Sequence, residues 1–230
     1  MTRLGRLLAI CLLALTGTAA QAQETGTLLQ HKAAQVRDRR SPGAARLVLE
    51  DFAACLLSRS PGRVSKMLAT PLDTREYRQQ FSALFESIND ECLSGGDLGL
   101  STGLLRGALF QAVYDREFGK KGPTSYASDL DTGYAATFGP NPSPEAISAI
   151  AMAQFGECIA RADPAGVRQL LIATSASPSE KLAFANVAPR IGACLPQGQQ
   201  FTLSRASVKG VLAESLYRLS VAASAKDGAK

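Results

Sequence analysis

Apolar residues in this chain recur at the spacing of a helix face, and the same pattern returns about 100 residues later. In the first occurrence the apolar positions follow i, i+1, i+4, i+7 and i+8, at Val48, Leu49, Phe52, Cys55 and Leu56. In the second occurrence the same positions hold Ala151, Met152, Phe155, Cys158 and Ile159. Residues at these spacings lie on one face of an α-helix. The pattern therefore predicts two equivalent helices, each with a cysteine on its buried face.

Helix-start signals mark the beginning of this helix in each copy and predict three more helices after it. The signals are a serine or aspartate before a proline, a capping box, and a serine before an apolar run. In the first copy they stand at Ser41-Pro42, Ser60-Pro61, Asp73-x-x-Glu76 and Ser101. In the second copy they stand at Ser143-Pro144, Asp163-Pro164, Ser177-x-x-Glu180 and Ser204. We therefore expect an all-α fold of two tandem homologous repeats, each of about four helices.

The chain divides into six predicted segments. They are a signal peptide at 1–22, a flexible basic arm at 23–40, a first helical repeat at 41–114, an aromatic-containing linker at 115–142, a second repeat at 143–219, and a disordered tail at 220–230. The linker carries Tyr126, Tyr134 and Phe138, which we interpret as rings that pin it across the repeats; the alternative is a binding loop. Pro189 interrupts the third helix of the second repeat and is expected to kink or break it.

The N-terminus has the pattern of a secretory signal peptide. Arg3 and Arg6 precede an apolar run at 7–15, and Ala20 and Ala22 supply the small residues before a cleavage point. An apolar run of about nine residues is too short to span a bilayer, which needs about 20. Cleavage is expected after Ala22, which places the mature chain in the periplasm or outside the cell without a transmembrane segment.

Charge adds little to the functional assignment. The chain has 25 basic and 20 acidic residues, and removal of Arg3 and Arg6 leaves a mature net charge of +3. Nucleic-acid binding usually requires a concentrated basic stripe, so the sequence does not predict it. The densest basic run, at 37–40, lies in the arm; it is interpreted as solvated, with contact to an anionic membrane as the alternative.

Four cysteines remain in the mature chain, because Cys11 is removed with the predicted signal peptide. An even number of cysteines in an exported chain predicts disulfides. Three pairings are possible, and the repeat favours Cys55–Cys92 and Cys158–Cys194. Each would close a loop of about 37 residues and stabilise the fold by about 4 kcal/mol. Metal sites usually use closely spaced pairs such as C-x-x-C, which the chain lacks, so neither a metal nor a cofactor is predicted.

Few polar residues are shared by both copies. Arg106 and Lys209 each precede a glycine, Gly107 or Gly210, inside the predicted fourth helix. Glycine there costs about 1 kcal/mol relative to alanine, so its recurrence indicates close helix packing. The two cations are interpreted as partners of neighbouring carboxylates, and the alternative is a pair of anion contacts. The chain's one histidine, His31, lies in the arm, and no catalytic motif accompanies it.

Several phrases together carry a resemblance to a known group of proteins. They are Phe52-x-x-Cys55, Leu68-Ala69-Thr70, Cys92-Leu93 and Leu105-Arg106-Gly107-Ala108, with their second copies. With them the chain resembles uncharacterised exported duplicated-repeat proteins of alphaproteobacteria. The resemblance covers both repeats and implies no activity, cofactor or catalytic residue.

The sequence as a whole favours an exported, non-catalytic helical repeat protein that binds a protein or envelope partner or supports an envelope structure. Two alternatives stay open at this point. One is a periplasmic enzyme with a site at the repeat interface, and the other is a carrier of an apolar ligand or lipid.

Overall fold

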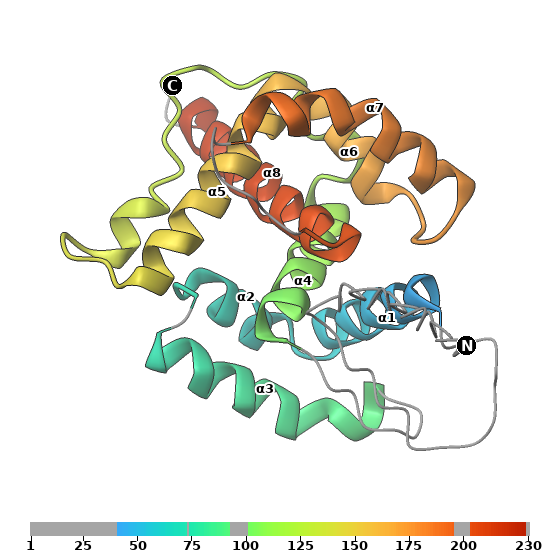
Figure 1. Ribbon diagram of the computed structural model, residues 1–230. Helices are drawn as coiled ribbons and strands as arrows, with labels where there is room; N and C mark the ends of the chain where they lie inside the picture. Colours follow the sequence, from blue (N-terminus) through green and yellow to red (C-terminus); the bar gives the residue numbers. More distant parts are fainter. Residues whose placement is uncertain (1–40, 73, 93–100, 196–202, 229–230) are drawn as a thin grey trace, which may run out of the picture.

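The computed structural model describes residues 41–72, 74–92, 101–195 and 203–228, and all regular structure in these ranges is helical (Figure 1). The N-terminal half comprises α1 (Pro42–Arg59), α2 (Pro61–Ala69), α3 (Arg75–Cys92) and α4 (Thr102–Glu117). The C-terminal half comprises α5 (Pro144–Ala162), α6 (Pro164–Ile172), α7 (Pro178–Cys194) and α8 (Arg205–Gly228). Two short 3-10 helices, η2 (Gly119–Lys121) and η3 (Ala135–Phe138), lie between the halves. The predicted all-α class is confirmed for these ranges, and the predicted signal peptide and basic arm lie outside them.

Most of the predicted helix starts are capped by the expected side chain. In each case the side-chain oxygen accepts a hydrogen bond from the backbone N–H three residues further on, at Ser41, Ser101, Ser143, Asp163, Ser177 and Ser204. Two starts differ from the prediction. Ser60 makes no side-chain cap hydrogen bond at the start of α2, and α3 has a different cap. There Thr74 is the cap, because its Oγ1 accepts from the Tyr77 N–H at 3.0 Å, while Asp73 lies outside the described residues.

One disulfide lies within each half. Cys55 of α1 is bonded to Cys92 at the end of α3, with a sequence separation of 37. Cys158 of α5 is bonded to Cys194 at the end of α7, with a separation of 36. Both predicted pairings are confirmed. Each bond ties the first helix of its half to the third.

Helices α4 and α8 cross at the centre of the molecule, with α1–α3 on one side and α5–α7 on the other (Figure 1). The crossing point is a pair of glycines. A Cβ built on Gly107 would lie 2.5 Å from the Cα of Gly210, and one on Gly210 would lie 2.9 Å from the Cα of Gly107. Real Cβ atoms do not approach other atoms that closely, so only glycine permits this approach. The close packing expected from the two glycines is present.

One expectation about the C-terminal half is wrong and another is settled only in part. Helix α7 is not broken by Pro189 but continues to Cys194, while the kink that was its other expected effect stays a prediction. Proline removes one backbone hydrogen bond, and the buried side chain of Val187 before it and the disulfide of Cys194 after it hold the helix on both sides. The predicted disordered tail from Ser220 is helical as far as Gly228. Ser220 is fully buried, because α8 packs along α5 rather than ending at the repeat boundary.

The linker is held against the C-terminal half by polar contacts and by its rings. The Arg168 guanidinium donates to the carbonyls of Gly122 and Pro123. The Tyr126 hydroxyl lies 2.7 Å from the Ser220 hydroxyl. Tyr134 is buried, and the guanidinium of Arg218 lies 4.4 Å from its ring centroid. These contacts agree with the pinned interpretation of the linker.

None of the described helices combines the length and the hydropathy that crossing a bilayer requires.

Candidate functional site

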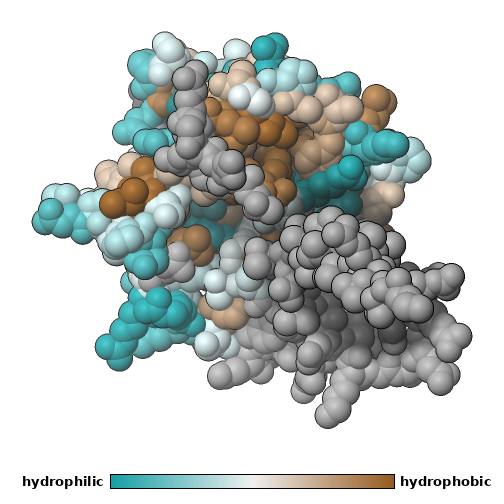
Figure 2. All heavy atoms as spheres, in the orientation of Figure 1, coloured by the Kyte–Doolittle hydropathy of each residue, from teal (hydrophilic) through white to brown (hydrophobic). Residues whose placement is uncertain are grey.

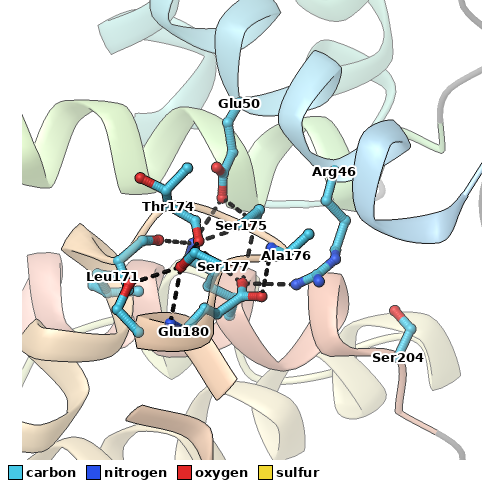
Figure 3. A network of polar contacts seen from close by, with 12 residues as sticks. Arg46, Glu50, Leu171, Thr174, Ser175, Ala176, Ser177, Glu180 and Ser204 are labelled. Carbon is cyan, nitrogen blue, oxygen red and sulfur yellow. Dashed lines mark hydrogen bonds and ion pairs between the residues drawn. The ribbon is translucent and has the colours of Figure 1, made fainter. Parts of the chain in front are cut away.

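A buried polar network lies where α1 meets the turn between α6 and α7 and the start of α8. Figure 3 shows Arg46 and Glu50 extending from α1 toward Ser175 and Glu180. Lys209 of α8 completes the group. We call these five residues the Glu180 network.

Glu180 is the central acceptor of the network. Its Oε1 accepts from Arg46 Nη1 at 2.7 Å and lies 3.1 Å from Ser175 Oγ, and its Oε2 accepts from the Ala176 N–H at 2.9 Å. Burial acts to raise the pKa of this carboxyl, but the Ala176 N–H together with Arg46 and Lys209 outweighs it, so the pKa lies below its usual range. In the predicted capping box Glu180 would accept from the N–H of Ser177. It accepts instead from Ala176, while the Ser177 N–H donates to the Thr174 carbonyl at 3.2 Å.

Lys209 joins the network to the end of α6. Its Nζ donates to Glu50 Oε1 at 2.7 Å and to the Ala173 carbonyl at 2.9 Å, and it lies 3.5 Å from Glu180 Oε1. The side chain is 3% exposed. A cation at a helix C-terminus satisfies orphan carbonyls and interacts favourably with the helix dipole. Lys209 therefore stabilises the end of α6 and also bonds a carboxylate of the N-terminal half.

Arg106 holds the corresponding place at the end of α2. Its Nη2 donates to the Leu68 carbonyl at 3.0 Å and to Glu214 Oε1 at 2.9 Å. Its Nη1 donates to the carbonyls of Thr70 at 3.1 Å and Met67 at 3.4 Å. Like Lys209, it bonds the end of a short helix in its own half and a carboxylate of the other half. Arg106 and Lys209 are thus buried cations in matching places of the two halves.

The surroundings of Arg106 and Glu214 favour the charged forms of both groups. The Arg106 guanidinium lies 5.2 Å from the Tyr77 ring centroid and 5.0 Å from that of Phe110, within cation–π range. Glu214 also accepts from Arg218 at 2.9 Å. Burial acts to raise the pKa of Glu214, but the two guanidinium groups outweigh it and hold that pKa below its usual range. The pair is a desolvated interaction across the α4–α8 crossing.

The carboxylate pairing expected for Arg106 and Lys209 is thus present. The anion contact considered as its alternative stays a prediction, and an external anion would have to compete with Glu214 or Glu50. The sequence did not single out Glu50, Ser175 or Glu214. For Glu214 the sequence offered only a weak indication of a buried ion pair, since it stands four residues before Arg218 among apolar residues.

The chemistry available in the Glu180 network includes a serine hydroxyl beside a lysine. Ser175 Oγ lies 2.8 Å from Glu50 Oε1 and 3.5 Å from Lys209 Nζ. Serine next to a basic group can act as a nucleophile when that group accepts its proton. Here Ser175 is 2% exposed, and the Lys209 Nζ donates to Glu50 and to the Ala173 carbonyl. This arrangement fixes the hydroxyl rather than opening it to a substrate.

No group of three or more His, Cys, Asp or Glu side chains that could hold a metal ion occurs in the described part of the chain.

The fold, the Glu180 network and the Arg106–Glu214 pair define the class of this protein: disulfide-bonded, helical in the ranges that the structure describes, and with charged groups paired at its centre. No protein-family model, curated protein or solved structure matches the chain.

Proposed function

We propose that this chain is an exported, non-catalytic protein, made of two tandem copies of one four-helix unit, that binds a protein or another component of the cell envelope. The observation that carries the proposal is the junction between the halves. Backbone meets backbone at Gly107 and Gly210, and the buried cations Arg106 and Lys209 are bonded to protein carboxylates. A junction of this kind packs the two units directly against each other, which suits a scaffold.

The duplication is supported by matching roles as well as matching residues. Arg106 and Lys209 each bond the carbonyls at the end of the second helix of their half. Each half also carries one disulfide between its first and third helices. Two unrelated units would not be expected to share both the buried cation and the disulfide at the same places along the chain.

Export is supported by the disulfides and by the N-terminal pattern. Disulfides persist in oxidising compartments and are rare in the cytosol. The expected mature N-terminus is Gln23, and Edman sequencing of the protein from a periplasmic extract tests it. A chain that retains Met1 in the cytosol, with free thiols, would contradict the assignment.

In-cell crosslinking tests the binding role. Leu182 is 64% exposed and Ile147 is 54% exposed, so a photo-crosslinking residue at either position leaves the core intact. Irradiation is expected to give a discrete adduct with an envelope component, and unirradiated cells provide the control. Recovery of the protein alone from both positions, over growth phases and envelope stress, would count against the proposal.

A second candidate is an enzyme with its site in the Glu180 network. The observation that favours it is Ala176, which adopts a φ of 62° beside Ser175. Strained backbone of this kind clusters at functional sites. The test is labelling by a fluorophosphonate probe, with Ser175→Ala as the variant and Ser179→Ala, at an exposed hydroxyl, as the control. Labelling lost only in Ser175→Ala would support an enzyme, whereas no labelling, or equal labelling of all three proteins, would exclude a reactive Ser175.

A further inference from the structure

The exposed basic residues of the N-terminal half are concentrated between the end of α1 and the first turn of α3. Five exposed cations lie in residues 59–78, namely Arg59, Arg63, Lys66, Arg75 and Arg78. The same stretch has two carboxylates, Asp73 and Glu76. The remainder of the chain from residue 41 has 14 basic and 16 acidic residues. The positive excess of the helical part therefore lies on this one segment, which we call the α2–α3 basic face.

Packing places the two helices of this face together. Helix α2 packs on α3, and Thr70 Oγ1 donates to Gln80 Oε1 at 3.0 Å. Arg63 and Lys66 are three residues apart on α2, as Arg75 and Arg78 are on α3, so each pair shares one side of its helix. Figure 2 shows hydrophilic residues gathered over the end of α3 that lies nearest α2 in Figure 1.

The α3 part of the face is hollowed. An open groove of about 430 Å³ is lined there by Arg75, Arg78, Gln79, Ser82 and Ala83. Guanidinium groups bind phosphate through paired hydrogen bonds, and amide and hydroxyl side chains add further donors. The groove therefore has the donor groups that a phosphate requires.

The corresponding positions of the C-terminal half are mostly uncharged. Counting from the starts of α2 and α6, and from the caps of α3 and α7, the corresponding positions of the C-terminal half are Ala162, Gly166, Gln169, Pro178 and Lys181. Four of the five are uncharged, although the helices run in the same order. The concentration of cations is therefore a feature of the N-terminal half and not of both halves.

We propose that the α2–α3 basic face binds the phosphate groups of an anionic membrane surface. The inference rests on the proposed export, because an exported protein meets the phospholipid of the cell envelope. Each Lys or Arg close to an anionic bilayer strengthens binding about fivefold at moderate salt. Five such residues give reversible attachment that weakens as salt screens the surface charge.

The test measures co-sedimentation of the mature chain with vesicles of 30% phosphatidylglycerol in phosphatidylcholine, and with phosphatidylcholine vesicles alone. The variant is Lys66→Gln/Arg75→Gln. The control is Lys181→Gln/Arg190→Gln, which removes the same charge from exposed positions on α7. We expect binding to the anionic vesicles only, with the partition coefficient lowered roughly thirtyfold in the variant. The control should lose less than about threefold, since its charges lie away from the face, and circular dichroism verifies that both variants are folded.

Three outcomes would overturn the proposal: no binding to anionic vesicles, equal losses in variant and control, or tighter binding to a DNA or RNA oligonucleotide than to the vesicles. Titration with inorganic phosphate distinguishes the phosphate of a lipid headgroup from free phosphate as the ligand. Binding of free phosphate without vesicle binding would assign the groove to a soluble anion and exclude the membrane. Vesicle binding and envelope crosslinking are read separately, so failure of the membrane proposal leaves the scaffold proposal to its own test.

Discussion

Gly107→Ala should destabilise this protein more than any other single-methyl addition to α4, because the new carbon has no room. It would lie 2.5 Å from the Cα of Gly210, which is backbone and cannot rotate away as a side chain can. Helices α4 and α8 would have to move apart by more than 1 Å to reach an ordinary contact near 3.5–4 Å. The ion pairs of Arg106 and Lys209 flank the crossing, so that movement would stretch both of them.

The expected change in the free energy of unfolding for Gly107→Ala is the sum of two opposing contributions. Replacing glycine by alanine inside a helix stabilises it by about 1 kcal/mol. Overpacking a close contact destabilises by about 1–3 kcal/mol and occasionally by more. Strained ion pairs add to the second term, since breaking a buried pair outright costs about 3–5 kcal/mol. The expected net loss is about 2–4 kcal/mol, or roughly 5–15 °C in Tm for a chain of this length.

Urea unfolding followed by circular dichroism at 222 nm measures the change. The matched control is Gly103→Ala in the first turn of the same helix, where an added Cβ meets nothing within 4 Å. The control should be as stable as the parent or slightly more so. The reasoning is refuted if Gly107→Ala unfolds at the same urea concentration as the control, because the crossing would then tolerate a methyl group.

Three further predictions concern other contacts. Gly43→Ala should destabilise the protein, because its Cβ would lie 2.6 Å from the Ala176 Cβ. Ala176→Gly removes that clash and the strain of an alanine at a φ of 62°, so the free energies of unfolding in urea should show a coupling of at least about 1 kcal/mol between the two substitutions. Changes in unfolding free energy that simply add in the double variant would contradict this. Glu214→Gln should cost about 3 kcal/mol at pH 7. Because the pKa of Glu214 is lowered in the folded protein, the carboxylate stabilises the fold above the usual value of 4.5, and this stabilisation is lost as pH falls through the folded pKa. The free energy of unfolding should therefore decline less steeply between pH 7 and pH 2.5 in the variant than in the parent. The same pH dependence in both proteins would contradict this. Replacing Cys55 and Cys92 by serine opens a loop with a sequence separation of 37 and should cost about 4 kcal/mol, which calorimetry under non-reducing conditions measures; an unchanged Tm would show that the bond does not constrain the unfolded chain.

Local chemistry explains why the helix starts could be predicted. A serine or aspartate cap bonds an N–H three residues away, so the signal is contained in a few neighbouring residues, as at Ser101 and Asp163. Pairing of Cys55 with Cys92 was predictable for a different reason, because a second copy of the pattern removed the ambiguity. Thr74 replaced Asp73 as a cap because both residue types accept such bonds, and their order in the turn decides between them.

The polar junction could not be predicted in the same way. Arg106 and Glu214 are 108 positions apart, and Lys209 and Glu50 are 159 apart. No periodicity relates such residues, and their meeting depends on how α4 crosses α8. The helical end of α8 was missed for a different reason, because the residues after Ser220 were taken as small and polar although Ala222, Ala223 and Ala225 favour a helix.

The amino-acid sequence by itself determined the helices, most of their caps and the disulfide pairs, because these depend on residues close together in the chain or repeated along it. Only the tertiary structure decided that Gly107 and Gly210 touch each other and that Arg106 and Lys209 each take a carboxylate from the other half. The physical reason is that two charges far apart in sequence are paired by the crossing of two helices, and the absence of a side chain at two glycines sets how closely those helices cross.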